Sequence, residues 1–194
     1  DRFDPAETSD ADFHLEDGST VSVPMMSQDM EGVSTARAEG VRAADLPYGG
    51  GAYSMTVVLP AEGTSLDSLV AAMDAGEWRS LVEQFGEGSE MPVQLPRFEI
   101  EWERQLNAAL ERMGMGPAFS PDSADFSRMA ETPACVSGLD PCLYVDWVKQ
   151  KSFVSVDEEG TEAAAATGVG VGPTSAPQPF RVDRPFLFAI RERL

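Results

Sequence analysis

Apolar and polar side chains alternate along several short stretches of the chain, and two of these stretches end at proline. Residues 21–23 and 53–59 alternate or run apolar and stop at Pro24 and Pro60, which is typical of β-strands. The glycine-rich segment 47–51 comes just before the second stretch and predicts a turn that connects it to a weaker strand. We therefore expect β-structure over much of the first third of the chain.

Two further strands are predicted later in the sequence. Phe98, Ile100 and Trp102 alternate with three glutamates, which indicates a strand with one solvated face. Residues 143–156 are rich in apolar side chains and are predicted to form one long strand. The chain contains no internal repeat, so a solenoid or a propeller is not expected.

Helical spacing occurs in three places between the strands. Ser65 is a suitable N-cap for a helix over residues 66–73, and a second short helix is predicted over residues 77–85. A third helical run ends at Gly114. The apolar positions of the three runs are Leu66, Leu69, Val70 and Met73; Trp78, Leu81, Val82 and Phe85; and Leu106, Ala109, Leu110 and Met113. Strands mixed with short helices predict the α+β class, mostly β.

The charge of the chain excludes some classes of partner. Its 194 residues include 33 acidic and 14 basic side chains, which gives a formal charge of −19. Phosphate backbones and anionic membranes would repel such a surface, so we expect neither nucleic acid nor a membrane as a partner. Only Lys149 and Lys151 are lysines. This bias fits either a salty habitat or an ordinary solvated surface in an arginine-rich protein.

Residues with metal or nucleophile chemistry are few. Cys135 and Cys142 lie in a turn-rich loop, where a disulfide or two free thiols are both open. His14 is the single histidine, far from both cysteines in sequence, and it gives little support for a Ser–His–Asp set. The acidic run from Asp4 to Asp17 lacks the ligand spacing of a Ca²⁺ loop. We expect no metal, no cofactor and no enzymatic activity.

The segment 157–185 has an unusual composition. No large side chain occurs between Glu162 and Gln178. One period-2 series within the segment consists of Thr161, Ala163, Ala165, Thr167, Val169 and Val171. Small or β-branched residues on one face suit a strand that enters a tight slot in a sheet, while alanine and glycine also allow an extended loop. The segment is therefore either a flexible linker or a loop that can become a strand.

This segment resembles the hinge and reactive-centre loop of the serpins, the serine-protease inhibitor family. The matching residues are Glu158-Glu159-Gly160-Thr161-Glu162-Ala163-Ala164-Ala165-Ala166-Thr167 and, downstream, Asp183-Arg184-Pro185-Phe186-Leu187-Phe188. Shorter matches occur in the family's order at Phe13-His14-Leu15, Val23-Pro24-Met25-Met26, Leu46-Pro47-Tyr48, Ser54-Met55, Leu59-Pro60, Leu95-Pro96-Arg97-Phe98 and Ala124-Asp125-Phe126-Ser127. The resemblance covers essentially the whole chain.

The resemblance implies a serpin-type multi-sheet α+β fold that is incomplete. Residues 1–194 would form a partial serpin domain, with the reactive-centre loop at about residues 158–180. The N-terminal half and the last strands of the family's fold would be absent. The residues over 143–156 would form the strand beside which the loop inserts.

The resemblance also implies a reactive bond. Counting from Gly160 to the Asp183-Arg184-Pro185 motif at the family's common spacing places the bond at Thr174–Ser175, with Gly172, Pro173 and Ala176 in the flanking subsites. A shift by one or two residues would make Gly172, Pro173 or Ser175 critical instead. Threonine suits a shallow apolar pocket, which favours elastase-like or subtilisin-like proteases over trypsin-like ones. No basic residue follows in the loop until Arg181.

The implied mechanism is suicide inhibition of a target serine protease. The protease forms an acyl ester with Thr174, and the loop inserts from Gly160 onward before the ester is hydrolysed. Insertion requires small hinge residues, and the hinge residues here are Glu158, Glu159, Gly160, Thr161, Glu162, Ala163, Ala164, Ala165, Ala166 and Thr167. Such a protein would be extracellular or periplasmic, monomeric when intact and prone to polymerise when truncated.

One ion pair is expected at the base of the loop. In the family the counterpart of Glu158 pairs with a basic residue, and Arg97 occupies that place, so a Glu158–Arg97 salt bridge is predicted to gate the insertion slot. The alternative is two exposed charges whose contact contributes about 0–1 kcal/mol. Many family members have histidine where this chain has Gln150, which leaves the latch at the slot's centre in question.

Two other functions remain open. The first is a non-inhibitory serpin that acts as a binding or carrier protein, for which a bulky or charged hinge would be expected. The second is an inactive fragment with exposed strand edges. The small hinge residues favour an inhibitor, although the 194-residue chain by itself is not expected to inhibit.

Overall fold

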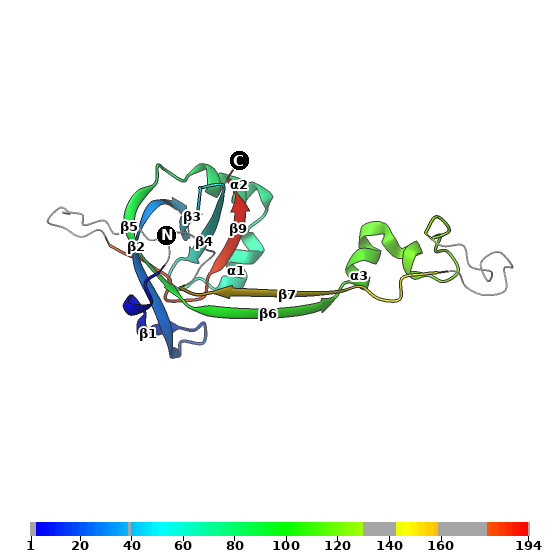
Figure 1. Cartoon of the computed structure of the whole chain (residues 1–194), viewed down its shortest axis with the longest axis horizontal. Coiled ribbons are helices and arrows are strands. Elements are labelled where there is room, and N and C mark those ends of the chain that lie inside the picture. The colour runs from blue at the N-terminus through cyan, green and yellow to red at the C-terminus, as the bar shows by residue number, and fades with distance from the viewer. Residues whose placement is uncertain (1–2, 39, 130–142, 159–177, 194) are drawn as a thin grey trace. The chain divides into compact units, whose positions relative to one another are not determined.

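The computed structural model describes residues 3–38, 40–129, 143–158 and 178–193 (Figure 1). The chain forms two compact units. The first consists of residues 1–98 and 156–194, and the second of residues 99–155. Within the described residues, no helix is long and apolar enough to cross a membrane.

The first unit is built on one sheet of seven strands. Its strand order is β8-β5-β2-β3-β4-β9, and β1 also pairs with β2. The strands are β1 (Ser9–His14), β2 (Thr20–Ala38), β3 (Val41–Tyr48), β4 (Tyr53–Pro60), β5 (Ser89–Pro96), β8 (Phe180–Arg181) and β9 (Leu187–Glu192). All pairings are antiparallel except that of β5 with β8. The predicted strand at 53–59 and the turn before it are confirmed.

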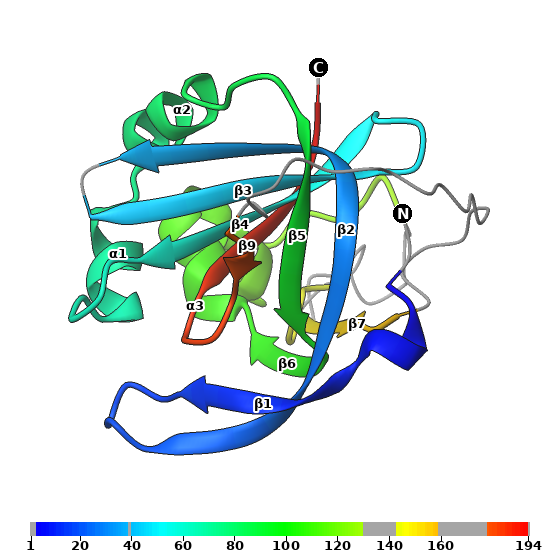
Figure 2. The same cartoon turned by 90° about the vertical axis from the view of Figure 1, so that its left-hand side faces the viewer.

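Strand β2 is much longer than the three residues predicted, because it serves two parts of the sheet. Its first part pairs with β1 and β5, and its last part, from Ser34, pairs with β3. The register shifts between Met30 and Val33, where Gly32 has a φ of 71° that glycine adopts without strain. Figure 2 shows β2 bending strongly along its length.

The bend of β2 encloses the main core of the first unit. The buried members of this core are Phe3, Met26, Met30, Val33, Ala44, Leu46, Met55, Val57, Leu59, Val93, Leu95, Phe180 and Val182. Burial of this apolar surface is the main term that stabilises the unit. Phe180 and Val182 follow segment 157–177 in the chain, so this core fixes the point at which the chain returns to the sheet.

Gly88 lies against the bulge in β2. A Cβ atom on Gly88 would stand 2.5 Å from the carbonyl oxygen of Gly32 and 2.6 Å from its carbonyl carbon. Both contacts are with backbone, which cannot rotate away as a side chain can. The close approach therefore requires glycine at position 88.

We expect Gly88→Ala to lower the free energy of unfolding by about 1–3 kcal/mol, because the backbone of β2 or β5 has to move. Gly86→Ala is the matched control, since a Cβ there meets no atom within 4 Å. Urea unfolding of the two variants measures the difference. Equal stabilities would contradict the close contact between Gly88 and Gly32.

Two helices cover a smaller core of the first unit. Helix α1 (Leu66–Ala72) is capped by Ser65, as predicted, with the Ser65 hydroxyl accepting from the Ser68 N–H. Helix α2 (Ala75–Glu83) begins two residues earlier than expected, because Asp74 accepts from the N–H groups of Gly76 and Glu77. The buried residues of this core are Ala36, Ala43, Val58, Leu69 and Leu81.

The second unit contains a two-stranded sheet of β6 (Phe98–Gln105) and β7 (Lys149–Val156). Lys149 pairs with Glu103 at 2.8 Å and Lys151 with Glu101 at 3.7 Å. The unit also contains α3 (Asn107–Leu110), η2 (Glu111–Met115) and η3 (Gly116–Phe119). Gly114 interrupts the helical run with a φ of 98°, which agrees with the predicted helix end.

Two predictions for the second unit need correction. The predicted single wet face of β6 is wrong, because Ile100 and Trp102 are 45% and 44% exposed and β6 pairs only with β7 among the described strands. The strand predicted from residue 143 begins at Lys149. Residues before it bond elsewhere: the Val145 N–H donates to the carbonyl oxygen of Ala118, and the Val148 N–H donates to Oδ1 of Asn107.

Candidate functional site at the base of the reactive segment

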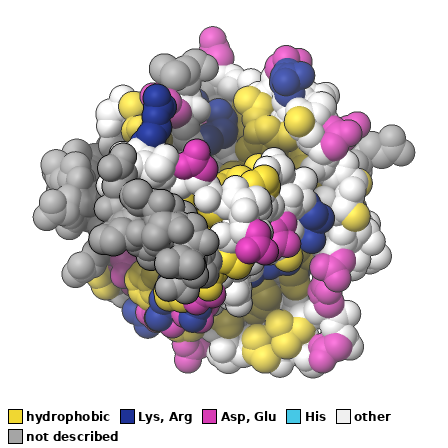
Figure 3. Space-filling view, turned by 90° about the vertical axis from the view of Figure 1, so that its right-hand side faces the viewer, with side chains coloured by type: hydrophobic (Ala, Val, Ile, Leu, Met, Phe, Trp, Pro, Cys, Tyr) yellow, Lys and Arg dark blue, Asp and Glu magenta, His cyan; other side chains and the backbone are white. Residues whose placement is uncertain are grey.

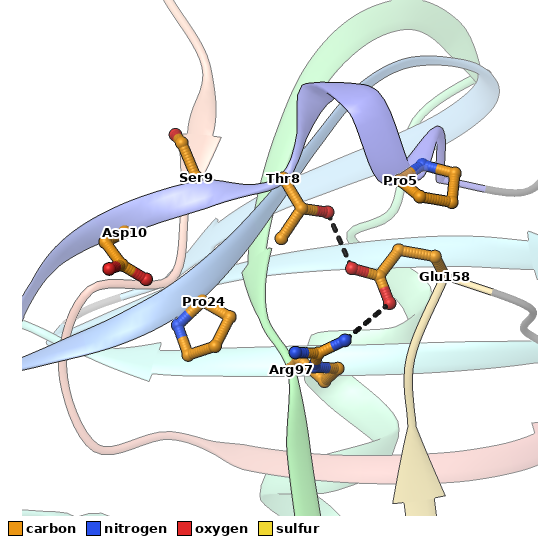
Figure 4. Close-up of a pocket in the computed structure, with 7 residues that line it drawn as sticks. All are labelled: Pro5, Thr8, Ser9, Asp10, Pro24, Arg97 and Glu158. Atoms are coloured by element: carbon orange, nitrogen blue, oxygen red, sulfur yellow. Dashed lines mark hydrogen bonds and ion pairs between the residues drawn. The ribbon is translucent and has the colours of Figure 1, made fainter.

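Glu158 lies just beyond β7, and its carboxylate is buried between two partners of the first unit (Figure 4). The Thr8 hydroxyl donates to Oε1 of Glu158 at 2.7 Å. The Arg97 guanidinium donates from Nη1 to Oε2 at 3.4 Å. The predicted pairing of Glu158 with Arg97 is therefore present. Both carboxylate oxygens are thus engaged.

Local structure positions the two partners. Thr8 follows the short 3-10 helix η1 (Pro5–Glu7), which Asp4 caps by accepting from the Ala6 N–H at 2.9 Å. Arg97 stands between β5 and β6, and its backbone N–H donates to the carbonyl oxygen of Pro24 at 2.9 Å. Segments far apart in sequence thus bring their side chains to Glu158.

These side chains line a pocket in the first unit. The pocket has a volume of about 490 Å³, and its lining residues are Pro5, Thr8, Ser9, Asp10, Pro24, Arg97 and Glu158. Figure 4 shows that the carboxylate of Glu158 faces Thr8 and Arg97 across this space. The pocket lies directly at the start of the predicted hinge.

The surroundings of Glu158 favour its charged form. The hydrogen bond from the Thr8 hydroxyl lowers the pKa of Glu158 most, and its own backbone N–H and the charge of Arg97 lower it further against the effect of burial. Arg97 is half exposed, so solvent screens its share. The Thr8 hydroxyl therefore lowers the pKa of Glu158 more than the ion pair that the sequence indicated.

Because the pKa of Glu158 is lower in the folded than in the unfolded chain, its contribution to stability is complete above the ordinary value of 4.5. It is lost as the pH falls through the folded value. We expect Glu158→Gln to lower the free energy of unfolding by about 1 kcal/mol at neutral pH, and this loss to disappear in acid. Urea unfolding of the full-length protein over a pH series, with Glu83→Gln as an exposed control, measures it. A loss that is as large in acid, well below the ordinary value of 4.5, as at neutral pH would contradict the account.

Several predicted site residues lie outside the described part of the chain. They are Glu159, Gly160, Thr161, Glu162, Ala163, Ala164, Ala165, Ala166, Thr167, Gly172, Pro173, Thr174, Ser175, Ala176, Cys135 and Cys142. Of the described candidates, Gln150 donates to the Ser152 hydroxyl at 3.4 Å. His14 is exposed on β1, with Nδ1 3.3 Å from the Thr20 hydroxyl. The described residues contain no group of three or more His, Cys, Asp or Glu side chains placed to hold a metal ion.

Thr8 is the site residue that sequence reasoning missed. Its contact with Glu158 joins positions 150 residues apart, and no periodic pattern signals such a contact. The Asp4-Pro5 pair, which begins η1, was the available local signal that the chain turns just before Thr8.

Comparison with known proteins shows the family to which the chain belongs. The family model described as serpin, serine protease inhibitor, matches residues 1–194. The chain belongs to the serpin family, and its α+β fold with several sheets is the serpin fold in incomplete form.

Curated relatives match over nearly the whole chain. Plasminogen activator inhibitor 1 of Neovison vison is 36% identical over 187 residues, covering 92% of this chain and 44% of the relative. Serpin B13 of Homo sapiens is 39% identical over 197 residues, covering 97% of this chain and 47% of the relative. The chain spans about half the length of the curated relatives it matches.

Solved structures agree. The thermophilic serpin tengpin in its native state matches with a TM-score of 0.76 and 28% identity, over 99% of this chain and 48% of that one. A thyroxine-binding globulin in complex with thyroxine matches with a TM-score of 0.77 and 29% identity, over 99% of this chain and 48% of that one. Uncleaved ovalbumin matches with a TM-score of 0.78 and 25% identity, over 99% of this chain and 50% of that one.

Proposed function

We propose that the protein containing this chain inhibits a serine protease as a suicide substrate, with Thr174–Ser175 as the reactive bond. The observation that carries the proposal is the burial of both residues that bracket the segment, Glu158 at 8% and Phe180 at 2% exposure. Between them the sequence supplies small hinge residues and an uncharged reactive pair. The family description supports protease inhibition as the class of activity.

The chemistry begins as ordinary proteolysis. The protease serine oxygen attacks the carbonyl carbon of Thr174, and the catalytic histidine takes the serine proton. The bond to the Ser175 nitrogen breaks, and that nitrogen receives the proton as the new amino terminus. An ester then joins Thr174 to the protease. Trapping requires that the freed segment inserts as a strand before water attacks this ester.

The contacts of Glu158 with Arg97 and Thr8 support a defined starting point for insertion. The carboxylate is held just beyond β7, and the proposed strand would form from Gly160 outward. Breaking both contacts loosens the base of the segment. We assign the pair Glu158 and Arg97 a gating role on this basis.

The residues at the bond suggest the class of protease. Thr174 is small and uncharged, Pro173 and Gly172 precede it, and Ala176 follows Ser175. These residues suit the shallow apolar pockets of elastase-like or subtilisin-like enzymes. A trypsin-like enzyme requires a basic residue, and Arg181 is seven positions beyond Thr174.

A binding or carrier function is the second candidate. One observation favours it: a structural neighbour of 29% identity is a thyroxine-binding globulin that holds thyroxine. The hinge argues against it, because Thr161, Ala163 and Ala165 carry no bulky or charged side chain. An extracellular or periplasmic location and a monomeric state when intact stay predictions.

The test mixes the full-length protein with elastase-type, subtilisin-type and trypsin-type proteases and separates the products on a denaturing gel. We expect a band at the summed mass that survives denaturant with one of the first two classes. Pretreating the protease with a serine-directed inactivator should abolish the band. Clean cleavage without the band would favour the carrier function.

A further inference from the structure

Two arginines face each other directly in the first unit. Arg37 at the end of β2 and Arg42 near the start of β3 are cross-strand partners. Like charges opposite each other in a ladder are unfavourable. Among the described residues neither arginine forms a salt bridge, and Glu39, which lies between them in sequence, is outside the described residues. The repulsion between the two arginines therefore lowers the stability of the fold, and packing does not require two arginines at these positions.

A third arginine joins this pair. The Arg184 Nε donates to the carbonyl oxygen of Pro60 at 3.3 Å, and Pro60 is the cross-strand partner of Val41, next to Arg42. Arg42 is half-buried, and burial together with the charges of Arg37 and Arg184 lowers its pKa. We call Arg37, Arg42 and Arg184 the arginine cluster.

The nearby acid does not balance the cluster. Asp183 opposes the shift at Arg42, but it is shared between Arg184 and Arg181, each at 3.6 Å. Its Oδ1 is buried and accepts no hydrogen bond within the described part of the chain. In the whole sequence the 33 acidic side chains outnumber the 14 basic ones, and Figure 3 shows acidic side chains at several places on one face. The cluster is therefore a local positive site on a strongly negative chain.

Phe180 connects the cluster to the proposed reactive bond. The Arg42 guanidinium stands 5.5 Å from the centre of the Phe180 ring, which holds it at this position. Phe180 is five residues after Ser175, so an extended chain separates them by at most about 18 Å. A protease of ~250 residues has a radius of gyration of about 18 Å. A protease seated on the proposed bond would be large enough to reach the cluster.

We propose that the arginine cluster is a recognition surface for an acidic patch on the target protease, beside the subsites that bind the residues after the cleaved bond. This inference rests on the proposed function and names a property of the partner. The net charge of the chain repels an acidic protease from other directions, and the cluster attracts it at the reactive segment. Orientation by charge raises the association rate more than it raises affinity.

The test measures association of the full-length protein with two subtilisin-type proteases whose catalytic serine is replaced by alanine, one acidic and one basic near those subsites. These proteases bind without acylation, so the measurement does not depend on trapping. We expect the double variant Arg37→Gln/Arg42→Gln to associate about 10-fold more slowly with the acidic protease at low ionic strength. The difference should shrink at high ionic strength.

Arg79→Gln/Arg112→Gln is the control with the same change in net charge, because both arginines are exposed and lie in α2 and η2. Arg42→Lys keeps the positive charge, and we expect this variant to retain most of the association rate with the acidic protease. Because Arg37 and Arg42 are a like-charged cross-strand pair, removing Arg37 alone should leave the melting temperature of the protein unchanged or raise it.

Two results would overturn the inference: equal rates for the wild type and the double variant, or an equal loss with the basic protease. Failure of the wild type to bind the acidic protease would overturn it as well. A denaturant-stable complex with any active protease would still support the proposed function in those cases. Salt-dependent binding without any covalent complex would refute the trapping mechanism, but it would still support the arginine cluster as a recognition surface.

Discussion

We expect the replacement of Thr161 by arginine to convert the proposed inhibitor into a substrate. In the proposed mechanism, the period-2 series that starts at Thr161 enters the sheet on insertion, and a buried unpaired charge there would cost several kcal/mol. Each 1.36 kcal/mol on the insertion barrier slows insertion tenfold, while hydrolysis of the ester is unchanged. We expect the fraction of encounters that end in a covalent complex to fall by at least about 100-fold.

Titration of the protease with increasing inhibitor measures this partition. Ala164→Arg is the matched control, because residue 164 belongs to the opposite period-2 series and its arginine would remain on the other face. The control should retain most of the trapping. Equal losses in both variants would mean that the segment does not insert as a strand in this register.

Thr174→Arg should have the second largest effect. A trypsin-type pocket carries a carboxylate at its base, and an arginine in the first subsite supplies the charge that it binds. We expect the rate constant for inhibition of a trypsin-type protease to rise by about 1,000-fold, since a desolvated ion pair lost or gained in such a pocket changes binding by several kcal/mol. Inhibition of the elastase or subtilisin class should fall correspondingly.

The position of the effect tests the assignment of the bond. Pro173→Arg, Ser175→Arg and Ala176→Arg carry the same charge at neighbouring positions and should not confer trypsin inhibition. Second-order rate constants for the four variants against one trypsin-type enzyme provide the comparison. The largest gain at position 173 or 175 would move the reactive bond by one residue.

Local signals in the sequence predicted the elements that depend on local contacts. The Ser65 cap and the apolar spacing after it gave α1 almost to the residue, because a cap and its helix are neighbours in the chain. The strand at Tyr53–Pro60 followed from its apolar run and its proline. Helix α2 begins two residues before the predicted residue 77, because Asp74 caps it by accepting from the N–H groups of Gly76 and Glu77.

Features set by distant contacts could not be predicted in the same way. Strand β2 runs to Ala38 because β1, β5 and β3 pair with different parts of it, and such pairing leaves no periodic signal. Strand β7 begins late because Asn107, 41 residues earlier, takes the N–H of Val148. The contact between Thr8 and Glu158 joins residues even further apart.

The residues of the candidate site also fall into a predictable and an unpredictable group. The family resemblance supplied Glu158 and Arg97, and the structure brings them together at 3.4 Å. It did not supply the Thr8 hydroxyl, which makes the shorter contact with Glu158. The arginine cluster was missed because the pairing of Arg37 with Arg42 becomes visible only with the register of β2 and β3.

The central claim is covalent trapping at Thr174–Ser175, and the mass of the purified complex tests it most directly. The full-length protein and its protease should give a denatured species whose mass is the sum of the two minus the mass of the segment that begins at Ser175, which is released from the covalent product. Sequencing of the released peptide should read Ser175-Ala176-Pro177 at its start. A protein that is cleaved between Thr174 and Ser175 but carries no covalently attached protease would contradict the account.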